Sequence, residues 1–191
     1  KNAADMILTD DNFATIVKAV EQGRGIFDNI KKAVHFLLGT NIGEILAVFA
    51  ASVMGLEAPL LPIQLLWINL VTDSLPAMAL GTEHFERDIM KRPPVSPKKG
   101  FFSDGLWIDI SLEGMLVGTL TVLAYLMGCL MFPAENTVIL GRTMAFCTLS
   151  ICEITHAVNM RSSVPLYKAG IFSNRMMNAA VAICTAVQIS V

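Results

Sequence analysis

Charged residues are scarce in this chain of 191 amino acids: Asp, Glu, Lys and Arg make up 16% of it, whereas hydrophobic residues make up 54%. An ordinary soluble domain, with about 25% charged and about 45–50% apolar residues, is therefore excluded. Disorder is also excluded, because disordered chains are poor in aliphatic residues. The net charge of −2 gives no support for nucleic-acid binding. The mean hydropathy of +0.59 predicts a protein that crosses a membrane several times.

Cysteine and histidine are rare as well. The four cysteines all lie in apolar stretches without CxxC spacing: Cys129, Cys147, Cys152 and Cys184. Such residues behave as small buried hydrophobes, which excludes a disulfide scaffold and a zinc site. His35, His84 and His156 have no second His or Cys at ligand spacing, and we assign them no role.

Long hydrophobic runs fill most of the remaining sequence. We expect an all-α membrane protein, a polytopic bundle of transmembrane helices over residues 25–191. The expected helices cover about residues 26–56, 60–80, 106–132 and 139–158, with an incomplete one at 176–191. The first begins with polar residues, and some 30 residues of helix measure about 45 Å, more than the roughly 30 Å of a membrane core. It should therefore project as a stalk.

The first 24 residues have a different character. A short strand is predicted at residues 6–8, followed by an amphipathic helix over residues 13–22 that Gly23 and Gly25 should end. This pattern is typical of the edge of a soluble α/β domain. The sequence has no initiator Met, and its last apolar run is shorter than a full span. We interpret it as an internal fragment of a longer polypeptide.

Basic residues are distributed unequally between the two sides of the expected bundle. One side carries Lys18, Arg24, Lys31 and Lys32 before the first span, then Arg87, Lys91, Arg92, Lys98 and Lys99, then Arg161, Lys168 and Arg175. The opposite side carries Arg142. Because cytoplasmic loops are rich in Lys and Arg, we expect the N-terminal end to face the cytoplasm.

Three carboxylates lie deep in the expected spans: Glu44, Asp73 and Glu153. An ionisable group in a span costs roughly 2.5–3.5 kcal/mol on insertion scales, which makes each a candidate for function. Asn41 precedes Glu44 by one helical turn, and Asn69, Thr72 and Asp73 share one face of the second span. We expect two oxygen-rich stripes that face each other. Taken alone, Asn41, Asn69 and Thr72 are equally typical of hydrogen bonds between membrane helices.

Pro76 distinguishes the second span. Its missing N–H would have bonded the carbonyl of Thr72, so the helix should kink or unwind near Asp73. Interrupted membrane helices bind hard cations through freed carbonyls and side-chain oxygens. Calcium, with about 6–8 oxygen ligands, fits this donor set best; magnesium usually retains waters, and sodium and protons remain open on donor type alone. We expect Asp109 and Glu113, near one end of the third span, to reach toward the interface.

Several segments resemble the P-type cation-transporting ATPases. The run Thr40-Asn41-Ile42-Gly43-Glu44 is similar to the fifth transmembrane helix of that family, and residues 65–76, LLWINLVTDSLP, are similar to the sixth. Residues 88–94, DIMKRPP, resemble the cytoplasmic loop that follows, and residues 4–13 resemble the end of the phosphorylation domain. The chain thus resembles the C-terminal transmembrane part of a calcium pump of the sarcoplasmic-reticulum type. Its short loop at residues 133–142 indicates a bacterial member.

The resemblance implies a domain division and a ligand set. Residues 1–24 would end the cytoplasmic phosphorylation domain, and residues 25–191 would form the transmembrane domain. Carried over position by position, the calcium ligands are Asn41, Glu44, Asn69, Thr72, Asp73 and Glu153. The family's phosphorylated aspartate and nucleotide-binding domain lie outside this sequence, so ATP and Mg²⁺ would serve the full-length protein and the fragment would not be catalytic alone.

The expected function is therefore ATP-driven export of Ca²⁺ from the cytoplasm, with protons neutralising the emptied carboxylates in counter-transport. The expected location is the bacterial cell membrane, and the expected partners are Ca²⁺, the lipid bilayer and the remaining domains of the same polypeptide, with no nucleic acid. A P-type pump for another cation, such as Na⁺, is one alternative. A passive cation channel or non-catalytic membrane subunit is another, because spans and carboxylates do not by themselves establish energy coupling.

Overall fold

A computed structural model describes residues 12–86, 88–94, 100–103, 105–132, 136–162, 170 and 173–191. Every regular element in these ranges is a helix: α1 (Phe13–Val53), α2 (Pro62–Trp67), the π-helix η1 (Ile68–Asp73), α3 (Ser74–Gly81), α4 (Leu106–Leu130), α5 (Thr137–Asn159) and α7 (Arg175–Ile189). The expected all-α polytopic bundle is confirmed. The strand predicted at residues 6–8 and the basic residues Arg87, Lys98, Lys99 and Lys168 lie outside the described residues.

Four helical stretches are long and apolar enough to cross a membrane: Phe13–Val53, Pro62–Gly81, Leu106–Leu130 and Thr137–Asn159. The second is α2, η1 and α3 together. They coincide with the first four expected spans to within a few residues, apart from the start of the first. The last helix, α7, has 15 residues, fewer than the roughly 20 that a full span needs.

Helix α1 is one continuous element of 41 residues, about 60 Å long. It begins at Asn12, whose side chain accepts a hydrogen bond from the backbone N–H of Ala14 at 3.0 Å. We expected Gly23 and Gly25 to separate a short helix from the stalk, and this is wrong. An interior glycine costs a helix only about 1 kcal/mol, too little to break it. Gly25 also serves packing, because a Cβ there would collide with the ring of Phe85.

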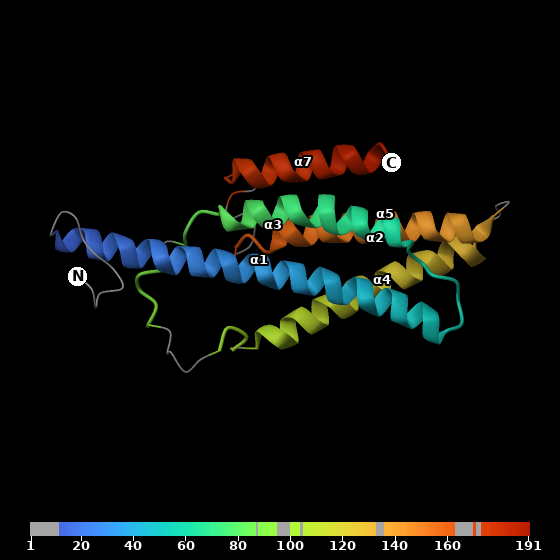
Figure 1. The fold of residues 1–191 in the computed structure, drawn as a ribbon, viewed down its shortest axis with the longest axis horizontal. Helices are drawn as coiled ribbons and strands as arrows, with labels where there is room; N and C mark the ends of the chain where they lie inside the picture. Colours follow the sequence, from blue (N-terminus) through green and yellow to red (C-terminus); the bar gives the residue numbers. More distant parts are fainter. Residues whose placement is uncertain are drawn as a thin grey trace.

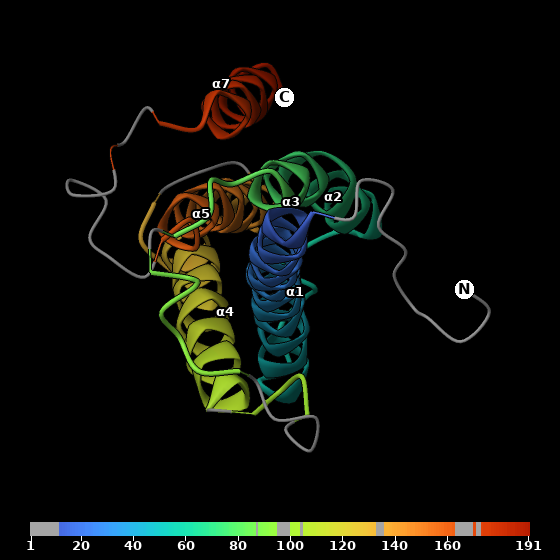
Figure 2. The same cartoon turned by 90° about the vertical axis from the view of Figure 1, so that its left-hand side faces the viewer.

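Glycines set the distance between α1 and α4. A Cβ added at Gly114 would lie 2.6 Å from Ile42 Cγ2 and 3.1 Å from the backbone oxygen of Gly39, and one at Gly118 would lie 2.9 Å from the oxygen of Gly43. The two backbones therefore touch, as small-residue motifs allow in membranes. In Figures 1 and 2, α1 and α4 run beside each other. We call this contact the glycine seam.

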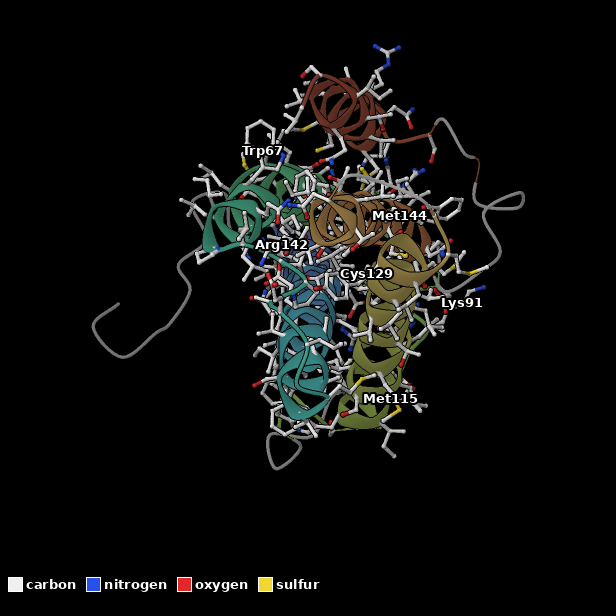
Figure 3. All side chains as sticks on the ribbon, turned by 90° about the vertical axis from the view of Figure 1, so that its right-hand side faces the viewer. Trp67, Lys91, Met115, Cys129, Arg142 and Met144 are labelled. Atoms are coloured by element: carbon white, nitrogen blue, oxygen red, sulfur yellow. The ribbon has the colours of Figure 1, made fainter. Side chains whose placement is uncertain are left out.

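The other helices pack on one side of this pair. Helix α5 lies against α4, where a Cβ at Gly141 would lie 2.5 Å from Cys129 Sγ (Figure 3). The α2–η1–α3 stretch packs on α1 and α5, and α7 lies beyond it (Figure 2). A core of Phe36, Leu80, Ala157 and Met177 joins α1, α3, α5 and α7. This arrangement brings one face each of α1, η1 and α5 together inside the bundle.

Candidate cation-binding site

The π-helix η1 replaces the expected break in the second span. Pro76 has no N–H to donate to the carbonyl of Thr72. The helix does not unwind there; residues Ile68–Asp73 form a π-helix, which is wider than an α-helix. The hydroxyl of Ser74 donates to the backbone oxygen of Asn69 at 2.9 Å, which satisfies one carbonyl of the widened turn. The predicted interruption is confirmed, but its form is a π-helix. Such turns are frequent at functional sites.

Asn69 on η1 contacts Glu44 on α1. The amide Nδ2 lies 3.1 Å from Glu44 Oε1 and 3.0 Å from Oε2, and it also lies 3.0 Å from the backbone oxygen of Leu65. Glu44 is 6% exposed. The side-chain oxygen of Asn69 is left to accept from, or bind to, another group. The two oxygen-rich stripes therefore do face each other at this point.

Two further hydrogen bonds connect η1 with its neighbours. Thr40 Oγ1 on α1 donates to Asp73 Oδ2 at 2.9 Å, and Thr72 Oγ1 donates to Glu153 Oε2 on α5 at 3.3 Å. Thr40, Thr72 and Glu153 are fully buried and Asp73 is 1% exposed. Three helices thus contribute carboxylates to one buried polar region, which we call the carboxylate site.

The carboxylate site is short of partners. Asp73 Oδ1 and Glu153 Oε1 are buried and accept no hydrogen bond from the described residues. The ion pairs among the described residues involve other carboxylates, so no Lys, Arg or His of these residues pairs with Glu44, Asp73 or Glu153. Buried oxygens of this kind are costly unless a cation or a proton joins them.

The three carboxylates do not form a closed metal cage in this arrangement. Across the described residues, no group of three or more His, Cys, Asp and Glu side chains is placed to hold a metal ion. Glu44, Asp73 and Glu153 are instead linked to neighbouring helices through Asn69, Thr40 and Thr72. A cation at this site would have to draw on amide and hydroxyl oxygens as well as carboxylates.

Asn41 is placed differently from the other five candidates. Its side-chain amide donates to the backbone oxygen of Leu37, one turn earlier in α1, at 2.6 Å. The neighbouring Thr40 makes the contact with Asp73 instead, and the sequence reasoning missed it. A usable signal existed in the spacing. Thr40 lies four residues before Glu44, and Asn41 lies three residues before Glu44; both spacings place a residue on the helix face of Glu44.

Two further expectations need correction. Glu113 does not reach toward the interface: its Oε2 lies 2.6 Å from His35 Nε2 and 3.4 Å from His156 Nε2. His35 and His156, to which we assigned no role, therefore share one carboxylate.

The four cysteines are free and buried or half-buried, as their apolar surroundings indicate.

Outside the spans, charged residues join the helix ends. Arg92 pairs with Asp28 of α1 and with Glu86 and Asp88, and its hydrogen bond holds the pKa of the Asp88 carboxyl below the usual value. Arg161 after α5 pairs with Glu83 after α3 at 2.9 Å. Burial raises the pKa of Glu83, but hydrogen bonds from Arg161 and Asn174 and the charge of Arg161 outweigh burial and lower it overall.

The fold and this site define a class: a polytopic helical membrane protein with an all-oxygen acidic site at an interrupted helix. A family model described as "Cation transporting ATPase, C-terminus" matches residues 57–191. The chain therefore belongs to the cation-transporting ATPase family and forms part of its C-terminal region.

Named relatives agree with this assignment. Calcium-transporting ATPase 1 of Bacillus cereus is 41% identical over 191 residues, covering 93% of this chain and 21% of the relative. The calcium-transporting ATPase of Bacillus subtilis is 42% identical over 181 residues, covering 95% and 20%. Calcium-transporting ATPase 1 of Schizosaccharomyces pombe is 38% identical over 182 residues, covering 95% and 20%. The chain spans about a fifth of the length of these relatives.

Proposed function

We propose that the intact protein is an ATP-driven calcium pump that exports Ca²⁺ from the cytoplasm, and that this chain forms its ion-binding transmembrane part. The observation that carries the proposal is the meeting of Glu44, Asp73 and Glu153 at the π-helix, without a basic residue among the described partners to neutralise them. The names of the relatives support calcium as the transported substrate.

The proposed ligands are Asn41, Glu44, Asn69, Thr72, Asp73 and Glu153. All offer oxygen, the donor that hard cations prefer, and calcium tolerates the irregular geometry of such a set better than magnesium does. The side-chain oxygen of Asn69 and the orphan oxygens of Asp73 and Glu153 are available without breaking a hydrogen bond. Asn41 would have to turn away from Leu37 to take part.

The remaining features of the proposal concern the whole protein. ATP and Mg²⁺ would act in domains outside this chain, and residues 1–24 would end the phosphorylation domain at the base of α1. The basic ends of the helices would face the cytoplasm of a bacterial cell. Release of Ca²⁺ on the far side leaves buried carboxylates without counter-charge, which favours the uptake of protons in exchange.

Calcium uptake by inside-out membrane vesicles that contain the full-length protein tests this proposal. We expect ATP-dependent ⁴⁵Ca²⁺ accumulation, and its loss with Asp73→Asn, which removes one charge without changing shape. Asp109→Asn, at an exposed acidic residue in the first turn of α4, is the matched control and should transport normally. Uptake that is retained by Asp73→Asn removes that residue from the site. Uptake of Na⁺ in place of Ca²⁺ would overturn the choice of substrate.

A further inference from the structure

Three titratable side chains meet at a second place in the bundle, separate from the carboxylate site. His35 of α1 and His156 of α5 both direct Nε2 at Oε2 of Glu113 on α4, at 2.6 Å and 3.4 Å. The two imidazoles are largely buried, with exposed fractions of 11% for His35 and 13% for His156, whereas the Glu113 side chain is 32% exposed. We call these three residues the histidine cluster. None of them belongs to the six proposed ligands.

The backbone leaves room for this cluster. A Cβ on Gly39 would lie 3.6 Å from both Glu113 Oε2 and His156 Nε2, an ordinary van der Waals distance, so the backbone of α1 runs directly beside the cluster. The ring of Phe36 packs on His156, with 5.8 Å between the ring centroids. Gly39 is also the first residue of the glycine seam. The cluster therefore lies at one end of the close contact between α1 and α4.

A cavity with several charged residues in its wall reaches His35 of the cluster from the basic side of the bundle. The cavity has a volume of about 340 Å³, and its wall includes His35 together with Asp28, Lys31, Lys32, Glu86 and Arg92. Around these groups, Arg92 pairs with Asp28 and Glu86, and Lys32 pairs with Glu86. Asp109, one turn before Glu113 on α4, is exposed. Water and protons can thus reach His35 from that side.

Histidine is the side chain that ordinarily changes charge between pH 5 and 8. When both imidazoles are neutral, Glu113 gives the cluster a charge of −1; one added proton makes it neutral, and a second makes it +1. An imidazolium binds a carboxylate more strongly than a neutral imidazole does, because the hydrogen bond is then charge-assisted on both sides. His35 makes this hydrogen bond at 2.6 Å, whereas His156 Nε2, at 3.4 Å, has no hydrogen-bond partner among the described residues. A proton added to the cluster therefore strengthens the contact between α1 and α4 and attracts α5 to the same carboxylate.

We propose that the histidine cluster is a proton-binding site, reached from the side we assign to the cytoplasm, which fastens α1 to α4 and α5 when it takes up a proton. Its position links it to transport, a consequence that rests on the proposed function. On α1, His35 precedes Thr40 by five residues, and on α5, His156 follows Glu153 by three. Proton occupancy thus biases the packing of two helices that carry carboxylates of the transport site.

Thermal unfolding of the purified protein in detergent tests the proton site without requiring transport. We expect Glu113→Gln to lower the unfolding temperature more at pH 6 than at pH 8, with a difference of about 2 °C or more between the two losses. The reason is that, in this proposal, Glu113 shares a bound proton with the imidazoles, and a proton-binding site is filled more at pH 6 than at pH 8. His156→Gln should show the same trend, and it answers the question if Glu113→Gln does not fold.

His84→Gln is the matched control, because His84 is exposed and lies outside the cluster; its effect should be equal at both pH values. Equal losses at pH 6 and pH 8 for Glu113→Gln and His156→Gln, or larger losses at pH 8, overturn the proposal. Calcium uptake at saturating Ca²⁺ is a second measurement. Relative to the wild-type protein, the ratio of uptake rates at pH 6 and pH 8 should change by about threefold in the cluster variants. Absence of any calcium uptake in the wild-type protein would contradict the proposed function and leave the unfolding result standing.

Discussion

At the scale of single residues, Thr40 is the side chain whose role the structure reveals most directly. Its hydroxyl donates to Asp73 across the contact between α1 and η1, and the other oxygen of Asp73 accepts no hydrogen bond from the described residues. Removing this hydroxyl leaves both oxygens of Asp73 buried without a donor from the described part of the chain. Thr40 therefore orients Asp73, one of the proposed ligands.

We predict that Thr40→Ala weakens calcium activation of the full-length ATPase by about tenfold, since leaving a buried charged acceptor without its donor costs about 1–3 kcal/mol. Thr40→Ser keeps the hydroxyl and should stay close to wild type. Thr119→Ala, at an exposed threonine of α4, is the control. The measurement is the Ca²⁺ concentration that gives half-maximal ATPase activity. Equal values for Thr40→Ala and Thr40→Ser would show that the hydroxyl has no such role.

Glu83 predicts how the stability of the protein depends on pH. Its pKa is lowered overall from the usual 4.5, so its stabilising effect is present above that value and disappears as the pH falls through the lower pKa of the folded state. At pH 7, Glu83→Gln should cost about 3 kcal/mol, because it breaks a buried ion pair between Glu83 and the guanidinium of Arg161. At acidic pH the wild type should converge on the variant. Unfolding temperatures measured from pH 7 downward check this, with Glu57→Gln, in an exposed pair with Arg142, as control.

The sequence predicted the carboxylates of the site better than their partners. Glu44, Asp73 and Glu153 stand out because ionisable residues are rare in apolar spans. Thr40 and Asn41 could not be separated, because both share the helix face of Glu44. The histidine cluster was missed for a different reason: its members come from three helices, and their contact depends on how each helix is rotated in the bundle. That rotation has no signal in the spacing of any one helix.

At the scale of helices, the interruption beside Pro76 decides which way η1 presents its side chains. A π-helical turn contains one residue more than an α-helical path over the same rise, so it changes the direction of the residues on its N-terminal side. Asn69 reaches Glu44, and Thr72 reaches Glu153, in this widened form. The sequence predicted where the helix is interrupted, because Pro76 lacks its N–H, but not how the chain compensates.

We predict that Pro76→Ala lets the second span revert toward a regular α-helix and thereby turns Asn69 away from Glu44. The calcium requirement of the ATPase should rise by about tenfold or more, while thermal stability stays equal or increases, since a helix-interior proline costs about 3 kcal/mol. Pro62→Ala is the matched control, because Pro62 begins α2, where a missing N–H is harmless. A drop in stability without a change in calcium requirement would contradict the prediction.

Helix α1 shows that glycine alone does not predict where a helix ends. Gly23 and Gly25 were expected to end the first amphipathic segment, yet the helix continues from Phe13 to Val53. The small local penalty of glycine is offset by tertiary contacts such as that between Gly25 and Phe85. The same residue type has a third use in the glycine seam, where its lack of a side chain fixes the distance between α1 and α4. Composition alone does not distinguish these uses.

At the scale of the whole molecule, the positive-inside rule predicts an orientation that can be tested. The end of the bundle that carries Arg24, Lys32, Arg92 and Arg161 should face the cytoplasm, and Glu57 and Arg142, which pair at 3.1 Å at the opposite end, should face outward. Ala58 and His84 are exposed at these two ends. The four natural cysteines lie within helices and are buried or half-buried.

We predict that Ala58→Cys reacts with a membrane-impermeant maleimide added to intact cells, whereas His84→Cys reacts only after the membrane is opened. The protein without added cysteines gives the background, and inside-out vesicles should reverse the pattern. The physical reason is that translocating several closely spaced Lys and Arg residues is far more costly than translocating Arg142 at the Glu57 end. Labelling of His84→Cys in intact cells would show that the bundle has the opposite orientation to the one predicted. The cavity beside His35 would then open to the outside, and the histidine cluster would respond to external rather than cytoplasmic protons.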